Sequence, residues 1–144
     1  MATTATLTLA SSDIAGDPVS VTKTATLTKA GSTNDLDQSS GLNRVHLRST
    51  TNKVLLAANA EGDNLAAKVY IINKSTDASL YVTITINAQT IGKLYGGDFM
   101  FIPWSQTDTS ASIEVAATNW TSSTGDIPVE YALFHVDTDF LTNA

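Results

Sequence analysis

The sequence contains no cysteine, so disulfide bonds, thiolate metal sites and cysteine nucleophiles are excluded. A chain without cysteine suits any redox environment, and this absence leaves the compartment open. The first twelve residues, MATTATLTLASS, lack the basic start and the apolar centre of a secretory signal peptide. No apolar run approaches the roughly 20 residues that a membrane-spanning helix requires. We therefore expect a soluble protein that is not secreted by the usual route and has no membrane partner.

Basic residues are scarce as well. Lys and Arg total 8 against 14 Asp and Glu, which gives a formal net charge of −6. A nucleic-acid-binding domain normally carries a basic stripe that neutralises phosphates. The densest basic cluster here, Arg44, Arg48 and Lys53, is interrupted by Ser and Thr. The sequence therefore argues against a nucleic-acid partner.

Catalytic motifs are missing too. There is no G-x-S-x-G, no phosphate-binding loop and no H-E-x-x-H. Only two histidines exist; we interpret His46 as a surface residue between two arginines and His135 as a partly buried strand residue. A Ser-His-Asp set forms only in space, so its absence does not follow from the sequence.

Four carboxylates are candidates for the paired acids of a glycoside hydrolase, which must share one cleft. Each occupies a single polar position on a predicted strand or at a strand end: Asp98, Glu114, Glu130 and Asp137. The polar segment Ala30–Gly41 holds Asn34, Asp35 and Asp37 but lacks the central Gly and the later Glu of an EF-hand. We therefore expect a solvated loop there, no enzyme, no catalytic residue, no metal and no cofactor.

Serine and threonine are abundant, at 36 of 144 residues. Threonine is β-branched and suits a half-exposed pleated surface, so this bias favours strands over helices. The length suits one domain. Eight to ten short strands with no convincing helix predict an all-β sandwich or barrel.

The segment Ala67–Trp104 holds most of the large apolar residues. Residues 69–72 are apolar on both parities, as in a strand covered on both faces, and residues 80–86 alternate. The polar residues 73–79 between them predict an antiparallel hairpin. Gly96-Gly97 between two further apolar segments, 89–95 and 98–104, predicts a second hairpin.

Other segments also have strand character. In residues 43–49, Val45 and Leu47 are predicted to point inward, while the basic residues between them point outward. The remaining predicted strands are Lys53–Ala60, Ser112–Thr118 and Ile127–Asp137, with polar loops at Ser105–Ser110 and Asn119–Asp126.

The N-terminal part is poor in large apolar side chains. Thr4–Thr8 (TATLT) recurs as Thr24–Thr28, with a predicted turn at Asp13–Pro18 between the two strands. We divide the chain into an N-terminal strand or arm region, residues 1–30, and a sandwich domain, residues 31–144. A segment with so little to bury is typical of an arm that becomes ordered on a partner. Whether residues 1–12 form such an arm or an integral strand remains open at this point.

Five aromatic residues allow two interpretations: Tyr95, Phe99, Phe101, Trp104 and Trp120. Flat rings suit sugar faces, so they could form a carbohydrate-binding platform. Packing in the core or at a subunit interface explains them equally well. We expect Trp104 to be a core residue and leave Trp120 open. The glycosylation sequons at Asn73 and Asn119 are interpreted as chance matches.

Several phrases of the central block resemble small virion proteins of tailed bacteriophages, especially those of marine and cyanobacterial hosts. The phrases are Val69–Asn73 (VYIIN), Val82–Ile84 (VTI), Ile91–Asp98 (IGKLYGGD) and Pro103-Trp104, and the similarity covers about residues 44–136. The resemblance implies a structural protein of the particle, either a capsid decoration (cement) protein or a comparable head or fibre component. It carries no site residues that transfer one by one.

Such proteins are often β-sandwiches or jelly rolls, and decoration proteins commonly form trimers at local threefold positions. We therefore expect an all-β, single-domain antiparallel β-sandwich of jelly-roll type. The expected partners are the major capsid protein of the phage head and further copies of the chain in a homotrimer. The expected location is the capsid exterior, after assembly in the host cytoplasm. The alternative is a carbohydrate-binding β-module of a phage fibre or tail component, with a glycan as its partner.

Overall fold

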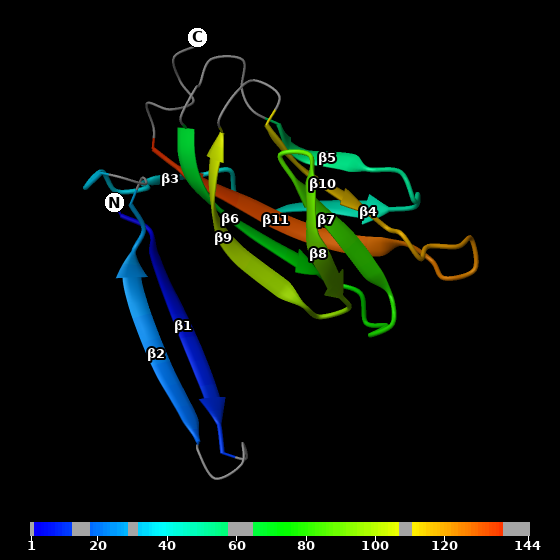
Figure 1. Ribbon diagram of the computed structural model, residues 1–144, viewed down its shortest axis with the longest axis horizontal. Helices are drawn as coiled ribbons and strands as arrows, with labels where there is room; N and C mark the ends of the chain where they lie inside the picture. The colour runs from blue at the N-terminus through cyan, green and yellow to red at the C-terminus, as the bar shows by residue number, and fades with distance from the viewer. Residues whose placement is uncertain (1, 13–17, 29–31, 58–64, 107–110, 137–144) are drawn as a thin grey trace.

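The computed structural model describes residues 2–12, 18–28, 32–57, 65–106 and 111–136 (Figure 1). Within these ranges the chain consists of strands and connections without a helix, so the predicted all-β class is confirmed. The strands are β1 (Thr4–Ser11), β2 (Val19–Thr26), β3 (Gln38–Ser39), β4 (Asn43–Leu47), β5 (Lys53–Ala57), β6 (Leu65–Asn73), β7 (Tyr81–Ile86), β8 (Gln89–Tyr95), β9 (Phe99–Gln106), β10 (Ser112–Ala116) and β11 (Ile127–His135).

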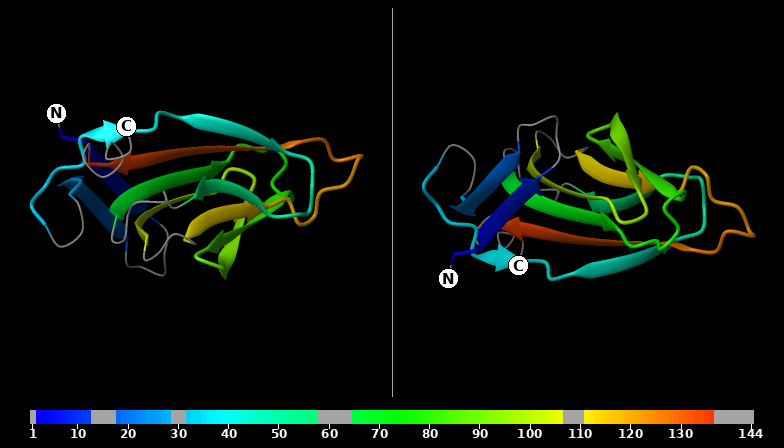
Figure 2. Two further views of the ribbon diagram at one scale, coloured as in Figure 1. Left: turned by 90° about the horizontal axis from the view of Figure 1, so that it is seen from above. Right: turned by 90° about the horizontal axis from the view of Figure 1, so that it is seen from below.

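Strands β3 to β11 form two antiparallel sheets (Figures 1 and 2). The smaller sheet has the order β5-β10-β7-β8. In the larger sheet the order is β3-β11-β6-β9, and β4 pairs with the same edge of β11 as β3. The predicted antiparallel β-sandwich is therefore confirmed. Strands β1 and β2 pair only with each other and belong to neither sheet.

The core lies between the two sheets and follows from strict alternation along their strands. Each central strand contributes every second side chain, and these inward residues are almost completely buried. They include Val69 and Ile71 of β6, Val82 and Ile84 of β7, Ile113 and Val115 of β10, and Ile127 and Val129 of β11. Val45 and Leu47 of β4 also face this core, as predicted.

Both predicted hairpins of the central block are wrong. β6 lies in the larger sheet and β7 in the smaller one, and β8 and β9 are divided in the same way. Polar turn residues between two apolar segments serve a crossing between sheets as well as they serve a hairpin. Here Asn73 is fully buried at the crossing, where its Nδ2 donates to Leu80 O (3.1 Å) and Leu94 O (2.9 Å).

Gly96 completes this crossing. A Cβ at that position would lie 2.3 Å from the Asp77 carbonyl oxygen, so only glycine lets the two loops approach this closely. The same contact explains why the Gly96-Gly97 pair does not close a hairpin between β8 and β9.

The hairpin that does form joins β7 to β8 through Asn87 and Ala88. Their φ angles of 47° and 64° are those of a two-residue loop with both central residues left-handed. The sequence signal was weak, because alanine stands where glycine is the favoured residue.

Some predicted boundaries change. The segment 30–41 is not only a solvated loop, since Leu36 is fully buried and Gln38–Ser39 pair with β11. The polar loop predicted from Ser105 begins later, because β9 continues through Gln106. The predicted turn at 13–17, the end of the strand at 58–60, the loop residues 107–110 and the tail with Asp137 lie outside the described residues.

Candidate interaction surface

The β1–β2 hairpin has two chemically different faces. Directly opposed residues in an antiparallel pair place their side chains on the same side, and the register pairs Leu9 with Val21 and Thr8 with Thr22. One side, here called the apolar hairpin face, holds Ala5, Leu7, Leu9, Ser11, Val19, Val21, Lys23 and Ala25. The other, the threonine face, holds Thr4, Thr6, Thr8, Ala10, Ser20, Thr22, Thr24 and Thr26.

Both faces are solvent-exposed. Leu7 and Leu9 are 47% and 49% exposed, and Val19 and Val21 are 39% and 43% exposed. Figure 1 shows the hairpin extending away from the sandwich, with the end of β1 and the start of β2 farthest from it. These exposed fractions show that the apolar hairpin face is only partly covered, and an isolated two-stranded hairpin is marginally stable in water.

The root of the hairpin is held in place. The backbone N–H of Leu27 donates to Thr3 O (2.8 Å), that of Leu36 to Leu27 O (2.8 Å), and that of Thr3 to Leu36 O (3.1 Å). The side chains of Leu27 and Leu36 are both buried. The hairpin is thus attached at one end and projects from a defined root.

Aromatic side chains occupy the outer side of the larger sheet beside this root. Tyr70 of β6 lies opposite Phe101 of β9, and the Tyr70 and Phe99 ring centroids are 6.5 Å apart. Phe134 of β11 meets Phe101 edge-on at 6.3 Å. Phe99 and Phe101 are 61% and 40% exposed, so both rings point away from the core and present a surface suited to an interface.

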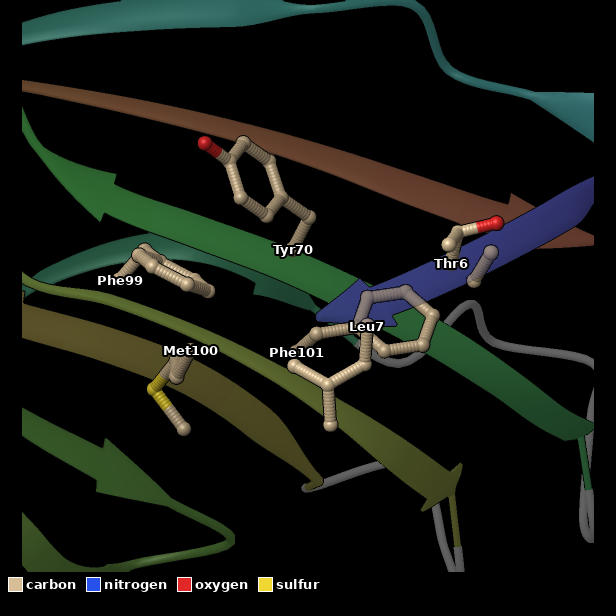
Figure 3. Close-up of a pocket in the computed structure, with 7 residues that line it drawn as sticks. Thr6, Leu7, Tyr70, Phe99, Met100 and Phe101 are labelled. Carbon is tan, nitrogen blue, oxygen red and sulfur yellow. The ribbon is translucent and has the colours of Figure 1, made fainter. Parts of the chain in front are cut away.

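A groove separates the hairpin from these rings (Figure 3). It has a volume of about 410 Å³. Ala5, Thr6 and Leu7 of β1 line one wall, and Tyr70, Phe99, Met100 and Phe101 line the other. We call this the aromatic groove. Among the described lining residues, the polar side-chain atoms are the hydroxyls of Thr6 and Tyr70.

The other predicted aromatic residues lie elsewhere. Trp104 is 2% exposed, and its Nε1 donates to Asn87 Oδ1 at 3.1 Å, which confirms the core assignment. Trp120 is partly buried against the core, and Tyr95 packs on Tyr81 with a centroid distance of 5.1 Å. The sugar platform of five rings, one of the two interpretations, therefore does not assemble, and only Phe99 and Phe101 of that set meet in the groove.

Charged residues on the outer side of β4 are neutralised within the chain. Arg44 Nε donates to Glu130 Oε1 at 2.9 Å, and Arg48 Nε lies 2.8 Å from Asp126 Oδ1. The hydrogen bond with Asp126 and its charge raise the pKa of Arg48 above its ordinary value. His46 is exposed, as predicted, with Nδ1 3.9 Å from Asp126 Oδ2. This face offers paired charges rather than a phosphate-binding patch.

Of the four candidate acids, the three that the structure describes are separately engaged. Asp98 accepts the Tyr95 N–H at 3.0 Å, Glu114 accepts Asn52 Nδ2 at 2.9 Å, and Glu130 is bound by Arg44. Among the residues that the structure describes, no three His, Cys, Asp or Glu side chains are grouped so as to hold a metal ion. His135 Nδ1 lies 3.0 Å from Val136 O, away from the aromatic groove.

The two sequons do not present free amides. Asn73 uses its Nδ2 within the buried crossing, and Asn119 Nδ2 donates to Ser79 O at 2.9 Å. This supports the interpretation of both sequons as chance matches.

The hairpin face and the groove were only partly foreseeable. The Thr-Leu-Thr-Leu alternation predicted a strand with an apolar side, but no sequence signal placed that side next to Phe99 and Phe101. Across the described ranges, no helix has the length and apolar character needed to cross a membrane. No family model, curated protein or solved structure matches this chain.

Proposed function

We propose that the protein is a non-enzymatic structural protein of a tailed-phage particle, a decoration protein that binds and stabilises the head. The observation that carries the proposal is the amphipathic hairpin, which projects from the sandwich and exposes its apolar face beside a row of aromatic rings. Exposed apolar surface of this extent marks a site of protein–protein contact. The virion setting comes from the sequence phrases of residues 44–136.

The hairpin is dispensable for the core, which supports an assembly role. The buried cluster between the sheets contains no residue of β1 or β2. Ordering a residue costs about 1–2 kcal/mol of conformational entropy. A half-exposed leucine or valine recovers only part of the roughly 1.5–3 kcal/mol available from full burial. A partner that covers the apolar hairpin face would complete this burial.

We further propose that β4 to β11 form a jelly roll. Every connection along these eight strands crosses between the sheets, except the β7–β8 hairpin. The resulting orders, β4-β11-β6-β9 and β5-β10-β7-β8, support two interlocked Greek keys. Jelly rolls occur in viral capsid and lectin domains, so this architecture suits both the proposed function and its alternative.

The proposed setting is the outer surface of the capsid, with the major capsid protein as partner and the chain itself as a homotrimer. The net charge of −6 favours solubility on a surface exposed to water. A chain that lacks cysteine needs no oxidising step to mature, which suits assembly in the host cytoplasm.

A glycan-binding module of a fibre is the second candidate, and one observation favours it. Phe99, Phe101 and Tyr70 expose ring faces in a groove of about 410 Å³. Specific small-molecule sites combine such apolar walls with a few well-placed polar groups that fix orientation. The described lining offers only two hydroxyls, so we favour the protein-contact role.

The test is to locate the chain in purified particles. Heads and tails would be separated, the chain quantified in each by mass spectrometry, and intact particles labelled with an antibody. We expect the chain in the head fraction, accessible from outside. Its presence only in fibres, together with host-polysaccharide binding that Phe99→Ala and Phe101→Ala abolish, would favour the glycan module. Absence from the particle would refute both.

A further inference from the structure

We infer that the aromatic groove of one copy receives the outer part of the apolar hairpin face, Leu9, Val19 and Val21, of a second copy of the same chain. This inference rests on the proposed function in treating the chain as an assembly protein, and it names the partner of the hairpin. The contact is a reciprocal exchange, in which each copy gives one hairpin and receives another.

Each copy carries both halves of this contact. The outer half of the hairpin exposes a cluster of aliphatic side chains, here called the distal cluster: Leu9, Val19 and Val21. The aromatic groove exposes rings that face the hairpin root (Figure 3). Both surfaces are apolar and exposed. The distal cluster lies on a two-stranded hairpin, and the rings line a groove.

The two halves do not meet within one copy. Leu7 already lines the groove, and Leu9 lies two residues farther along β1, about 7 Å away at the rise of a strand. β1 runs from the root toward the free end of the hairpin (Figure 1), so the distal cluster lies beyond the groove of its own chain. A neighbouring copy is needed to bring the cluster onto a groove.

The exposed area fits such an assembly. Six side chains contribute to the two surfaces: Leu7, Leu9, Val19, Val21, Phe99 and Phe101, which are 39–61% exposed. At roughly 150–200 Å² for a large apolar side chain in full contact with water, they leave on the order of 500 Å² per copy. In a reciprocal pair the two contacts form one interface that buries about 1,000 Å² of apolar surface, the lower bound for a biological interface, whereas in a ring of three each contact buries about 500 Å² from these side chains.

The charges allow this burial. β1 and β2 contain a single charged residue, Lys23, and the described lining of the groove contains none. Among the described residues of the two strands and of the groove lining, no ion pair has to be broken and no carboxylate desolvated when the distal cluster enters the groove. Giving one hairpin and receiving one is a contact between different surfaces, which leaves no unfilled groove when the rotation between copies closes it into a ring. The proposed homotrimer is such a ring.

Mixed disulfide trapping tests the contact directly, because the natural chain has no cysteine. Leu9→Cys and Phe99→Cys proteins would be prepared separately, mixed and oxidised at micromolar concentration. We expect a cross-linked pair containing one chain of each kind. The matched control is Thr8→Cys mixed with Phe99→Cys, because Thr8 lies on the threonine face one residue away. Equal cross-linking of Thr8→Cys would show random collision and overturn the inference.

Sedimentation gives an independent measurement. Leu9→Lys with Val21→Lys places two charges at one opposed pair of the distal cluster, and Thr8→Lys with Thr22→Lys does the same on the threonine face. We expect at least a tenfold higher dissociation constant for the first variant and wild-type assembly for the second. Both sites are exposed, so near-ultraviolet circular dichroism should show an intact sandwich in each. Equal dissociation of both variants, or a monomeric wild type, would overturn the inference.

The outcomes separate this inference from the proposed function. A chain that is monomeric in solution but present on phage heads leaves the proposed function standing and refutes the hairpin exchange; its hairpin then binds the capsid protein. A chain that assembles through Leu9 and Phe99 but is absent from particles supports the exchange and refutes the virion role.

Discussion

The sandwich and the hairpin use the same sequence pattern with opposite results. In β7, threonine alternates with aliphatic residues, and Val82 and Ile84 are almost completely buried. In β1 the same alternation leaves Leu7 and Leu9 about half exposed. Alternation therefore specifies a strand with an apolar side, whereas burial depends on whether a second layer covers that side.

This difference in burial also separates residues that stabilise a single copy from residues that contribute to binding a partner. Residues covered by both sheets contribute to the free energy of folding of one copy, because their burial is complete within the chain. Residues of the apolar hairpin face contribute fully only when a partner covers them. Substitutions in the two regions should accordingly change different measurable quantities.

The largest expected effect on stability is that of Trp104→Ala. Trp104 lies in the core, so its removal leaves a cavity and deletes the bond to Asn87, at a cost of about 3–5 kcal/mol in the free energy of unfolding. Urea denaturation followed by circular dichroism measures this loss. Phe101→Ala, an exposed aromatic residue of the same strand, is the control and should cost less than about 1 kcal/mol in a monomeric background. Equal losses would remove the distinction between the two sides of β9.

Deleting residues 2–12 should abolish assembly and leave the sandwich folded. The deletion removes β1 and the two root bonds of Thr3, with Leu27 and Leu36, but no residue of the core cluster. Its thermal midpoint should lie within about 4 °C of that of the Leu9→Lys/Val21→Lys protein, which is the appropriate reference because loss of assembly alone lowers the midpoint. Particles carrying the deletion should lose the protein. A much larger fall in midpoint would show that β1 is an integral strand of its own domain.

Asn73→Ala should cost about 3 kcal/mol. The substitution leaves the carbonyls of Leu80 and Leu94 without their donor in a buried site, and an unpaired buried acceptor costs about 1–3 kcal/mol. Urea titration gives the value. Asn52→Ala, whose amide bonds Glu114 at the exposed surface, is the matched control and should change stability by less than about 0.5 kcal/mol. A small effect at Asn73 would mean that the crossing between the sheets is held by Gly96 packing alone.

The sequence predicted the class of fold well because β-structure rests on local alternation. The strand at residues 43–47, with Val45 and Leu47 inward, and the burial of Trp104 both followed from parity and size. The strand pairing predicted for the central block was wrong, because an apolar segment does not encode which strand lies beside it. At the crossing of residues 73–79, Asn73 and Gly96 contact loops that are distant in sequence, so their roles appear only when these loops meet.

The sequence predicted the parts of the candidate interaction surface but not that these parts lie side by side. The N-terminal alternation and the Phe99–Phe101 parity were visible, and an interface was one of the two interpretations offered for the rings. Their proximity depends on the root of the hairpin, where the buried Leu36 lies within a segment that otherwise has the composition of a loop. A single leucine among polar residues is too weak a signal to place a hairpin in space.

Ala88→Gly should stabilise the protein by about 0.5–1 kcal/mol. Alanine at a φ of 64° meets the steric cost of the left-handed region, which glycine avoids. Thermal denaturation should show a rise of a few degrees. Ala78→Gly is the matched control, because Ala78 is also exposed in a loop but does not have a positive φ, so glycine there should destabilise slightly. Stabilisation by both substitutions would point to a general effect of glycine in loops.

The smallest expected effect is that of pH, which should act on Asp77 of the sandwich but not on the hairpin contact. Hydrogen bonds from the Ser79 hydroxyl and backbone N–H lower the pKa of Asp77 below its ordinary value of 3.8. A lowered pKa in the folded state means that this contribution to stability is present above the unfolded value and is lost as the pH falls through the folded one. NMR titration should therefore place Asp77 below an unperturbed aspartate, and Ser79→Ala should bring it back toward 3.8. β1 and β2 contain no carboxylate, so the dissociation constant of the assembly, measured by sedimentation of the natural chain down to pH about 4, should stay unchanged. If the assembly weakened as the pH fell over that range, while the sandwich stayed folded, a carboxylate outside β1 and β2 would have to take part in the contact between copies.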